Sequence, residues 1–381
     1  MEAFTFYLPT EIIFARGSIE QIGEEVAKLG DKCLVVSGKT FARKSGYLDF
    51  IDRKLTESNL RAIVFDEVEP NPSIETIYKG AKVAKTNGCD IFVGFGGGSV
   101  IDAAKAIAFL ASNDVKLEDH FYPNVVTEPS GSIVAIPTTC GTGSEVTKYA
   151  VITDVAARKK EVLTGLPILP KVALLDANVL NGLPKHMVAY TGFDALSHSL
   201  EAILSKASND VSDMFAIESI RVIHEYLVGA YEGCPEARER LFYGSMLAGV
   251  AINFAGTIVV HGMAYYLTTY HGIHHGLANA LMLPHFLRFE QSHLSDKLQR
   301  VATNLRLEDV EAVLRMVEDL ADDVGIPKSL VDLGIEISEL DSMVSDAMSY
   351  DRSIEKTPVE ISDKAIREIY NMAFTGRGRA K

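Results

Sequence analysis

Cysteine is scarce in this chain of 381 residues, and its four cysteines (Cys33, Cys89, Cys140 and Cys234) lie far apart without a C-x-x-C pair. Neither a disulfide framework nor a thiolate zinc site is indicated, and a reduced, cytoplasmic location fits this usage. Positive charge is also in deficit, since 37 Lys and Arg face 51 Asp and Glu for a formal charge of −14. This excess of acid argues against nucleic acid and anionic membranes as partners. Phosphate-bearing cofactors stay allowed, because they bind through local backbone N–H groups.

Long apolar runs are missing as well. The most apolar segment, residues 246–260, contains Asn253 and Thr257 and is shorter than the roughly 20 residues of a membrane span. It predicts a buried helix. The N-terminal residues show no basic region followed by an apolar one, so we expect no signal peptide.

The order of the expected elements indicates two domains. Apolar and β-branched runs predict strands at residues 4–8, 11–14, 33–37, 61–65, 90–94, 132–136 and 172–175. Helices are expected between several of these strands, one of them capped by Ser18, and this alternation predicts a doubly wound, mostly parallel sheet in an α/β domain over residues 1–180. Helical periodicity dominates afterwards, so residues 181–381 are expected to form an all-α domain that ends in a frayed tail at residues 377–381.

One stretch of the second half has the pattern of a metal site. On a helix, Asp194 and His198 lie one turn apart, and Glu201 follows on the same face. An apolar segment ends at His261, and a His-rich turn follows at residues 271–276. One Asp and three His suit a divalent transition metal better than Mg²⁺ or Ca²⁺. The alternative for the first pair alone is a solvated Asp–His contact.

Two glycine-rich loops of the first half could bind phosphate. Residues 94–99 (GFGGGS) follow a predicted strand and open a helix, where the backbone can approach a pyrophosphate and the helix N-terminus favours negative charge. Ser99 replaces the last glycine of the G-x-G-x-x-G fingerprint, and a tight βα connection is the alternative. Residues 137–145 (PTTCGTGSE) follow another strand. Two such loops could clamp one nucleotide, although a Thr-rich loop can also bond to its own backbone.

Four segments carry a resemblance to a known family. Residues 96–105 (GGGSVIDAAK), 137–147 (PTTCGTGSEVT), 191–201 (TGFDALSHSLE) and 274–279 (HHGLAN) resemble, in order and spacing, the motifs of the iron-containing (group III) alcohol dehydrogenases. The resemblance covers nearly the whole chain. It implies a dehydroquinate-synthase-like fold with a dinucleotide-binding domain followed by a helical metal- and substrate-binding domain.

The resemblance also implies roles for single residues. The implied metal ligands are Asp194, His198, His261 and His275. The residues assigned to the cofactor are Gly38, Lys39, Thr40, Asn71, Gly97, Gly98, Ser99, Asp102, Thr138, Thr139, Thr142, Ser144, Val151 and Lys160. Fe²⁺ is the expected ion, and Zn²⁺ could occupy the site as isolated, because zinc binds more tightly than iron in the divalent series.

Two departures from the family pattern bear on specificity. Many members have a His four residues after the third ligand, where this chain has Tyr265, and this segment resembles the branch of NADP-dependent propanediol and butanol dehydrogenases. Gly38 stands where NAD-preferring members carry an Asp, and Lys39, Arg43 and Lys44 are close in sequence. Without a carboxylate to repel a 2′-phosphate, we expect NADP(H) rather than NAD(H).

The expected reaction is hydride transfer between the nicotinamide and a small primary alcohol or its aldehyde, with Tyr265, His271 and the cofactor ribose as candidate proton relays. Alternatives within the superfamily are a zinc glycerol dehydrogenase and a dehydroquinate-synthase-like lyase, which usually lack one of the four ligands. A non-catalytic binding module would show a degraded ligand set. The family suggests a homodimer or larger homo-oligomer.

Overall fold

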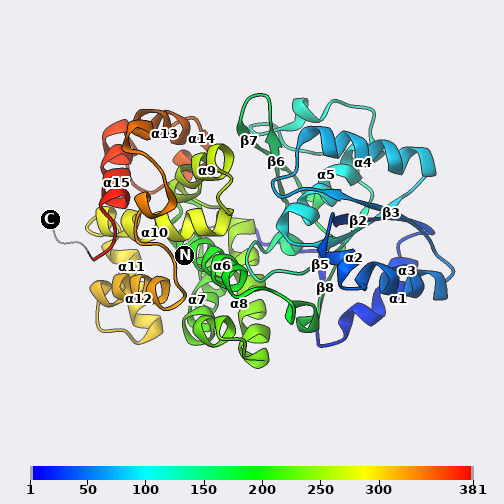
Figure 1. Ribbon diagram of the computed structural model, residues 1–381, viewed down its shortest axis with the longest axis horizontal. Coiled ribbons are helices and arrows are strands. Elements are labelled where there is room, and N and C mark those ends of the chain that lie inside the picture. The colour runs from blue at the N-terminus through cyan, green and yellow to red at the C-terminus, as the bar shows by residue number, and fades with distance from the viewer. Residues whose placement is uncertain (1–2, 379–381) are drawn as a thin grey trace. The chain divides into compact units, whose positions relative to one another are not determined.

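The computed structural model describes residues 3–378, which divide into two compact units (Figure 1). One unit comprises residues 7–139 and 143–183, and the other comprises residues 3–6, 140–142 and 184–378. The chain passes from the first unit to the second at Leu183 and Pro184. Two short segments of the first half, residues 3–6 and 140–142, thus belong to the helical unit. A single domain boundary near residue 180 does not describe this division.

A six-stranded parallel sheet forms the centre of the first unit. Its strands are β1 (Glu11–Phe14), β2 (Lys32–Gly38), β3 (Arg61–Val68), β4 (Ile91–Gly96), β5 (Ser132–Pro137) and β8 (Val172–Leu175). Their spatial order is β1-β8-β5-β4-β2-β3, so the chain winds outward from β2 to β3 and then returns to β4 on the other side of β2. The carboxyl ends of β2 and β4 therefore meet where the winding reverses, the place at which such sheets bind ligands. The predicted doubly wound sheet is confirmed.

Helices cover both faces of this sheet (Figure 1). On one face lie α1 (Ile22–Ala27), α2 (Phe41–Lys44) and α3 (Tyr47–Glu57), and on the other lie α4 (Ile74–Asn87) and α5 (Gly98–Ser112). The core under α4 and α5 includes Leu34, Phe92, Ile107 and Phe109, all of them fully buried. Every residue of β4 is buried, as expected for a strand whose two faces are both covered.

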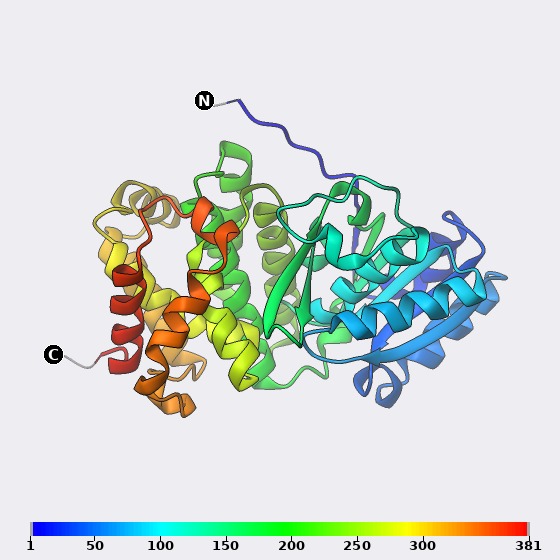
Figure 2. The ribbon, with the colours of Figure 1, turned by 90° about the horizontal axis from the view of Figure 1, so that it is seen from above.

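The hairpin of β6 (Tyr149–Asp154) and β7 (Lys159–Thr164) was not predicted. Figure 2 shows it as a pair of long green arrows. The strands pair antiparallel, with Tyr149 opposite Thr164. Both strands mix polar and charged residues with apolar ones, so they lack the continuous apolar runs that are typical of parallel strands.

Two predictions near the N-terminus are wrong. Residues 4–8 form no strand; instead the Phe6 ring stacks on Phe254, with 4.3 Å between the ring centroids. Ser18 does not cap a helix with its side chain. A 3-10 helix begins there after Gly17, which takes the left-handed conformation, and the Ser18 hydroxyl is buried without a hydrogen-bond partner among the described residues.

The second unit is helical. Its helices are α6 (Lys185–Leu204), α7 (Asp210–Tyr231), α8 (Pro235–Ala255), α9 (Val259–His271), α10 (His275–Glu290), α11 (Ser295–Leu305), α12 (Val310–Asp323), α13 (Leu340–Ala347), α14 (Asp351–Lys356) and α15 (Asp363–Thr375). Helix α10 packs against α6, α9, α12 and α15. Thirteen of the residues of α10 are buried.

Two expectations in this unit need correction. Residues 246–260 are mostly buried but do not form one helix, because α8 ends at Ala255 and α9 begins at Val259, after Gly256 with φ of +70°. Within residues 3–378 no single helix has the length and apolar character to cross a membrane; only the bent pair α8 and α9 meets those two criteria together. Arg377 is no part of a frayed tail, since its guanidinium is buried and bonds to Asp322 and to the carbonyl of Ile326. Residues 379–381 lie outside the described part of the chain.

Candidate active site

Three helices of the second unit bring metal-binding side chains together. Asp194 on α6, His261 on α9 and His275 on α10 each place one ligand atom within 4.8 Å of the other two. Asp194 and His261 are almost completely buried. One carboxylate and two imidazoles that converge in this way fit a divalent transition metal.

The fourth predicted ligand, His198, lies beside this group rather than within the 4.8 Å spacing. Its ring stacks on that of His261, with 4.9 Å between the centroids. Its Nδ1 lies 3.2 Å from the carbonyl oxygen of Gly141. Because a carbonyl oxygen only accepts hydrogen bonds, this contact favours the tautomer with hydrogen on Nδ1 and leaves the Nε2 lone pair available to a metal.

Glu201 orients the His261 ring in the same way. Its Oε1 lies 2.6 Å from His261 Nδ1, and its Oε2 accepts a 2.8 Å hydrogen bond from the backbone N–H of Ile258, at the start of α9. The carboxylate is fully buried. The Nε2 atom of His261 is thereby turned toward Asp194 and His275. The sequence placed Glu201 on this helix face but gave it no role, although a metal-ligating His usually bonds to such a partner.

Gly276 allows α10 to approach α6 closely. A Cβ atom at this position would lie 2.2 Å from the backbone oxygen of Tyr190 on α6. Only glycine fits there, and it follows His275 directly in the chain. The same residue that brings the two helices together therefore also places His275 near Asp194.

The charges in this group suit metal binding. Burial acts to raise the pKa of Asp194, but the nearby imidazoles of His198, His275 and His261 outweigh it and lower the pKa to about 2. Burial lowers the pKa of His198 to about 4. The carboxylate is thus ionised and His198 is neutral at pH 7, the protonation states in which these groups bind metals.

The two candidate proton relays lie in different surroundings. The ring of Tyr265 stacks against His275, with 5.6 Å between the centroids, and is buried. His271, at the end of α9, instead places its Nε2 atom 2.8 Å from Glu339, which also accepts a hydrogen bond from Tyr266. The structure therefore brings Tyr265 to the ligand group and ties His271 to an acidic partner.

In the first unit, the first predicted phosphate loop and the start of the second, residues 137–139, lie at the carboxyl edge of the sheet. Gly97 precedes α5, and a Cβ atom on Gly97 would come within 3.2 Å of Thr139. Thr138 donates its backbone N–H to the carbonyl of Gly96, which joins the ends of the two loops. Ser99, in the first turn of α5, accepts a 3.2 Å hydrogen bond from the backbone N–H of Asn71.

Asp102 and Lys105 on α5 form hydrogen bonds with residues at the end of the second loop and just after it. Asp102 accepts hydrogen bonds from the hydroxyl of Ser144 at 2.5 Å and from the backbone N–H of Val151 at 2.9 Å. The fully buried Lys105 ammonium donates to Ser144 and to the carbonyl of Thr147. Burial lowers the pKa of this lysine to about 8. Asp102 is thus engaged with the protein itself, in a position that shapes the loop.

The remaining predicted cofactor residues are more dispersed. Lys160 on β7 is buried and donates to Thr153, and burial lowers its pKa to about 7. Thr142 belongs to the short segment that packs with the helical unit. Gly38 ends β2, and Lys39 and Thr40 follow it in exposed positions.

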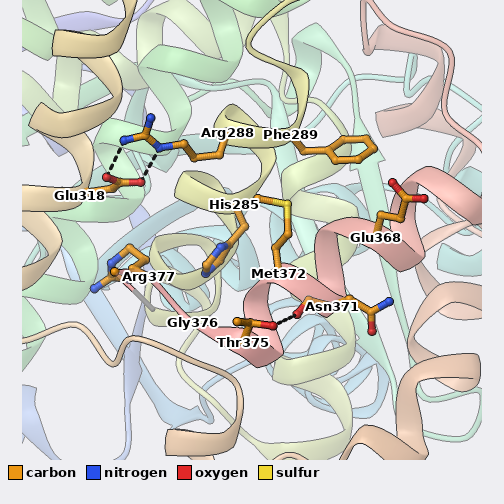
Figure 3. Close-up of a pocket in the computed structure, with 11 residues that line it drawn as sticks. His285, Arg288, Phe289, Glu318, Glu368, Asn371, Met372, Thr375, Gly376 and Arg377 are labelled. Atoms are coloured by element: carbon orange, nitrogen blue, oxygen red, sulfur yellow. Dashed lines mark hydrogen bonds and ion pairs between the residues drawn. The ribbon is translucent and has the colours of Figure 1, made fainter. Parts of the chain in front are cut away.

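A pocket of about 680 Å³ elsewhere in the helical unit contains none of these residues (Figure 3). It lies between α10, α12 and α15, and His285 lies ten residues beyond His275, or about 15 Å along α10. Its lining includes Arg288, whose guanidinium is paired with Glu318. We assign no part of the reaction to this pocket, because the metal-binding side chains do not line it.

Sequence reasoning also missed Asn279. This buried residue lies on α10 one turn after His275, and its amide nitrogen is 2.8 Å from Asp194 Oδ1. The spacing from His275 was visible in the sequence and is the same i, i+4 relation that singled out Asp194 and His198.

Comparison with known proteins agrees with this architecture. Residues 9–177 match the family model of iron-containing alcohol dehydrogenases, and residues 188–374 match the model of the C-terminal region of the Fe-containing alcohol dehydrogenase family. The 1,3-propanediol dehydrogenase of Citrobacter freundii is 34% identical over 97% of this chain and 99% of its own length. An NADPH-dependent butanol dehydrogenase of Clostridium saccharobutylicum is 31% identical over 97% of this chain and 98% of its own.

An NAD-dependent methanol dehydrogenase of Bacillus methanolicus is also 31% identical, over 90% of this chain and 92% of its own. Among solved structures, that of a 1,3-propanediol oxidoreductase superposes with a TM-score of 0.93 at 33% identity, covering 98% of this chain and all of that one. The family is one of metal- and NAD(P)-dependent oxidoreductases that act on small alcohols and aldehydes. The chain therefore belongs to the iron-containing alcohol dehydrogenase family.

Proposed function

We propose that this enzyme transfers a hydride between NADP(H) and a small primary alcohol or its aldehyde, of the butanol or 1,3-propanediol type. The observation that carries the proposal is the convergence of Asp194, His261 and His275, with His198 stacked beside them. Two relatives of this chain are named as dehydrogenases of such alcohols. A divalent ion bound by these four side chains would supply a Lewis acid for the substrate oxygen, and the nicotinamide would supply the hydride.

The side chains and backbone of this chain would bind and orient the cofactor and the substrate and exclude water from them. We propose that the backbone of Gly97 and Gly98 and the hydroxyl of Ser99 hold the pyrophosphate at the N-terminus of α5. Tyr265 is our first candidate for a proton relay because it lies against His275. A protein nucleophile is not needed, and burial raises the pKa of the nearby Cys140 thiol to about 11, so it is not poised to react.

The preference for NADP(H) is supported by the charges that follow β2. Gly38 offers no carboxylate, and Lys39 and Lys44 are exposed, without an ion-pair partner within residues 3–378. Arg43 contributes less than the sequence suggested, because its guanidinium pairs with Asp66 and lowers the pKa of that carboxyl. The proposed 2′-phosphate site therefore depends mainly on the two lysines.

The test is reconstitution of metal-stripped protein with Fe²⁺ or Zn²⁺ under anaerobic conditions, followed by oxidation of NADPH or NADH with butanal. We expect activity to return when metal is added and to be higher with NADPH than with NADH. We expect Fe²⁺ to restore more activity than Zn²⁺. The His275→Ala variant should stay inactive, whereas His293→Ala, a change at an exposed histidine, should recover like the unaltered protein. Stoichiometric consumption of NADPH also separates this reaction from that of a lyase.

No activity with either metal and either cofactor would contradict the proposal.

The oligomeric state is a separate question. We propose that the chain forms a homodimer or a larger homo-oligomer, and sedimentation equilibrium of the full chain would measure its mass.

A further inference from the structure

Strand β6 and the residues just before it pair with β7 on one side and pack against α5 on the other (Figure 1). On the β7 side, the carbonyl of Lys148 accepts a hydrogen bond from the backbone N–H of Gly165. Backbone polar groups alternate in direction along a strand, so the carbonyls of Thr147 and Tyr149 face the α5 side. The sheet of β6 and β7 has two strands within residues 3–378, and the polar groups of such an edge need partners of another kind.

Lys105 on α5 supplies these partners. Its ammonium donates hydrogen bonds of 2.8 Å to the carbonyl of Thr147 and 2.7 Å to that of Tyr149. A third bond, of 2.9 Å, goes to the hydroxyl of Ser144 at the end of the second loop. An ammonium has three N–H donors, so these three bonds use all of them.

Asp102, three residues earlier on the same helix, continues this edge. One of its carboxylate oxygens accepts the backbone N–H of Val151 at 2.9 Å, and the other accepts the hydroxyl of Ser144. The ammonium of Lys105 lies 3.8 Å from this carboxylate. Two charged side chains of α5 thus take the place of a neighbouring strand and fix the hairpin to the helix.

The residues that Lys105 fixes in place belong to the proposed cofactor site. Ser144 is bonded to it directly, and Val151 and Lys160 lie on the hairpin that it holds. Helix α5 itself begins at Gly98, in the proposed pyrophosphate site. Because Lys105 is fully buried, its ammonium acts on the cofactor only through the residues that it holds.

We propose that Lys105 is a positioning residue for the dinucleotide, because it fixes the β6–β7 hairpin and the end of the second loop against α5. The proposal rests on the proposed cofactor site. Without the ammonium, the carbonyls of Thr147 and Tyr149 would lose their partner inside the protein, and the hairpin would have to shift to let water reach them. Such a shift moves Ser144 relative to the N-terminus of α5 and weakens cofactor binding.

The experiment measures dinucleotide affinity directly, by titrating the full-length protein with NADPH and with NADH at pH 7 and following the fluorescence of the cofactor. Burial lowers the pKa of Lys105 to about 8, so the ammonium is protonated at this pH. Lys105→Met keeps the length of the side chain but removes all of its N–H donors. We expect the dissociation constants of NADPH and NADH both to rise at least about tenfold, since buried acceptors lose their partner.

Two further readouts separate positioning from other roles. The ratio of the two dissociation constants should stay within about twofold, because the 2′-phosphate is expected near the end of β2 rather than at the hairpin. In steady-state kinetics, the KM for NADPH should rise while kcat changes by less than about threefold. Zn²⁺ affinity should not change, since Lys105 and the metal-binding side chains belong to different units.

A second variant covers the case in which methionine prevents folding. Lys105→Gln keeps an NH₂ donor without the charge, so it should weaken both cofactors in the same direction by a smaller factor. Ile107→Ala is the matched control, since Ile107 is a fully buried residue of α5 that packs in the core under α4. It should lower the unfolding temperature and leave both dissociation constants unchanged.

Three results would overturn the proposal. Unchanged dissociation constants in a variant that unfolds at a lower temperature would mean that Lys105 has a purely structural role. A much larger loss for NADPH than for NADH would mean that its charge, rather than the hairpin, acts on the cofactor, and an equal loss in Ile107→Ala would mean a general loosening of α5. Failure of the proposed cofactor site looks different, because the unaltered protein itself would then bind neither NADPH nor NADH.

Discussion

Glu201 and His261 form a fully buried pair in which a carboxylate oxygen lies 2.6 Å from the imidazole Nδ1. Burial acts to lower the pKa of His261, but the Glu201 carboxylate outweighs it, so the pKa is raised. The same carboxylate accepts the backbone N–H of Ile258 and so also fixes the start of α9. One side chain on α6 therefore sets both the position of α9 and the orientation of the ligand that α9 carries.

This pair predicts the effect of Glu201→Gln. The glutamine amide keeps the size of the side chain but loses the negative charge, so the His261 ring is held less firmly and is a weaker base. Changes of this kind typically reduce metal affinity by about 10–100-fold, and we expect a loss in that range for Zn²⁺ in a chelator competition.

Glu290→Gln provides the matched control for this change. Glu290 is a buried acid on α10 that also contacts a histidine, His293, at 2.9 Å, but neither residue belongs to the ligand group. Its replacement should leave Zn²⁺ affinity unchanged. Equal losses in the two variants would show that the effect of Glu201 is a general result of removing a buried charge.

The different surroundings of Tyr265 and His271 predict different kinetics. General acid–base groups contribute about 10²–10⁴-fold to rates, so Tyr265→Phe should lower kcat by at least about tenfold if the hydroxyl passes the proton. His271→Ala should change kcat by less than about twofold, because His271 is bonded to Glu339. A full pH profile of kcat for both variants is the measurement, and a large drop in His271→Ala alone would reverse the assignment.

Gly38 predicts a switch of cofactor. A side chain is sterically allowed there, since a Cβ atom would lie 3.6 Å from the carbonyl oxygen of Val68 and 3.8 Å from Val100. Gly38→Asp would place a negative charge where we expect the 2′-phosphate, so kcat/KM with NADPH should fall at least about tenfold while that with NADH stays level or rises. Gly38→Asn adds nearly the same volume without the charge and should largely retain the preference. An unaltered protein that already prefers NADH would remove the basis of this prediction.

Much of the fold was accessible from the sequence because its signals are local. The buried runs of β2 and β4 and the helix that contains Asp194 and His198 follow from hydrophobicity and spacing over a few residues. The β6–β7 hairpin was missed because its strands carry polar residues on both sides of the apolar ones. This mixed pattern of polar and apolar residues is also typical of loops, so hydrophobicity alone does not identify the two strands.

The contacts that complete the site are not local. Asn279 meets Asp194 across 85 positions of sequence and Glu201 meets His261 across 60. A spacing rule within one helix identifies candidate side chains, but it does not show which of them face each other from α6, α9 and α10. For the same reason the sequence did not show that Arg377 is buried and pairs with Asp322, 55 positions earlier in the chain.

Glu145 predicts a dependence of stability on pH. It is buried on the second phosphate loop, its Oε1 has no hydrogen-bond partner within residues 3–378, and burial raises its pKa from 4.5 to about 7. The folded state thus binds the proton more tightly than the unfolded state, and the group's favourable contribution is present below pH 4.5 and lost as pH rises to about 7. The loss amounts to roughly 3 kcal/mol, at about 1.36 kcal/mol for each pKa unit.

Glu145→Gln removes this titration. The variant should gain stability relative to the unaltered protein between pH 5 and pH 8, by up to roughly 3 kcal/mol, and should show little gain at pH 4.5. Urea unfolding across this pH range is the measurement. Glu75→Gln, on the exposed side of α4, is the control and should leave the pH dependence as it is.

Gly276→Ala tests whether the approach of α10 to α6 builds the metal centre. The added carbon would lie 2.2 Å from the Tyr190 carbonyl oxygen, a backbone atom that cannot rotate away, so the two helices must separate and carry His275 away from Asp194. We expect a lower unfolding temperature and a loss of Zn²⁺ affinity of at least about tenfold, since one ligand in the group is displaced. In Gly182→Ala the new carbon meets only Phe41, at 3.9 Å, and neither property should change. Lower stability with full Zn²⁺ affinity in Gly276→Ala would mean that His275 reaches the ion without this close contact between the helices.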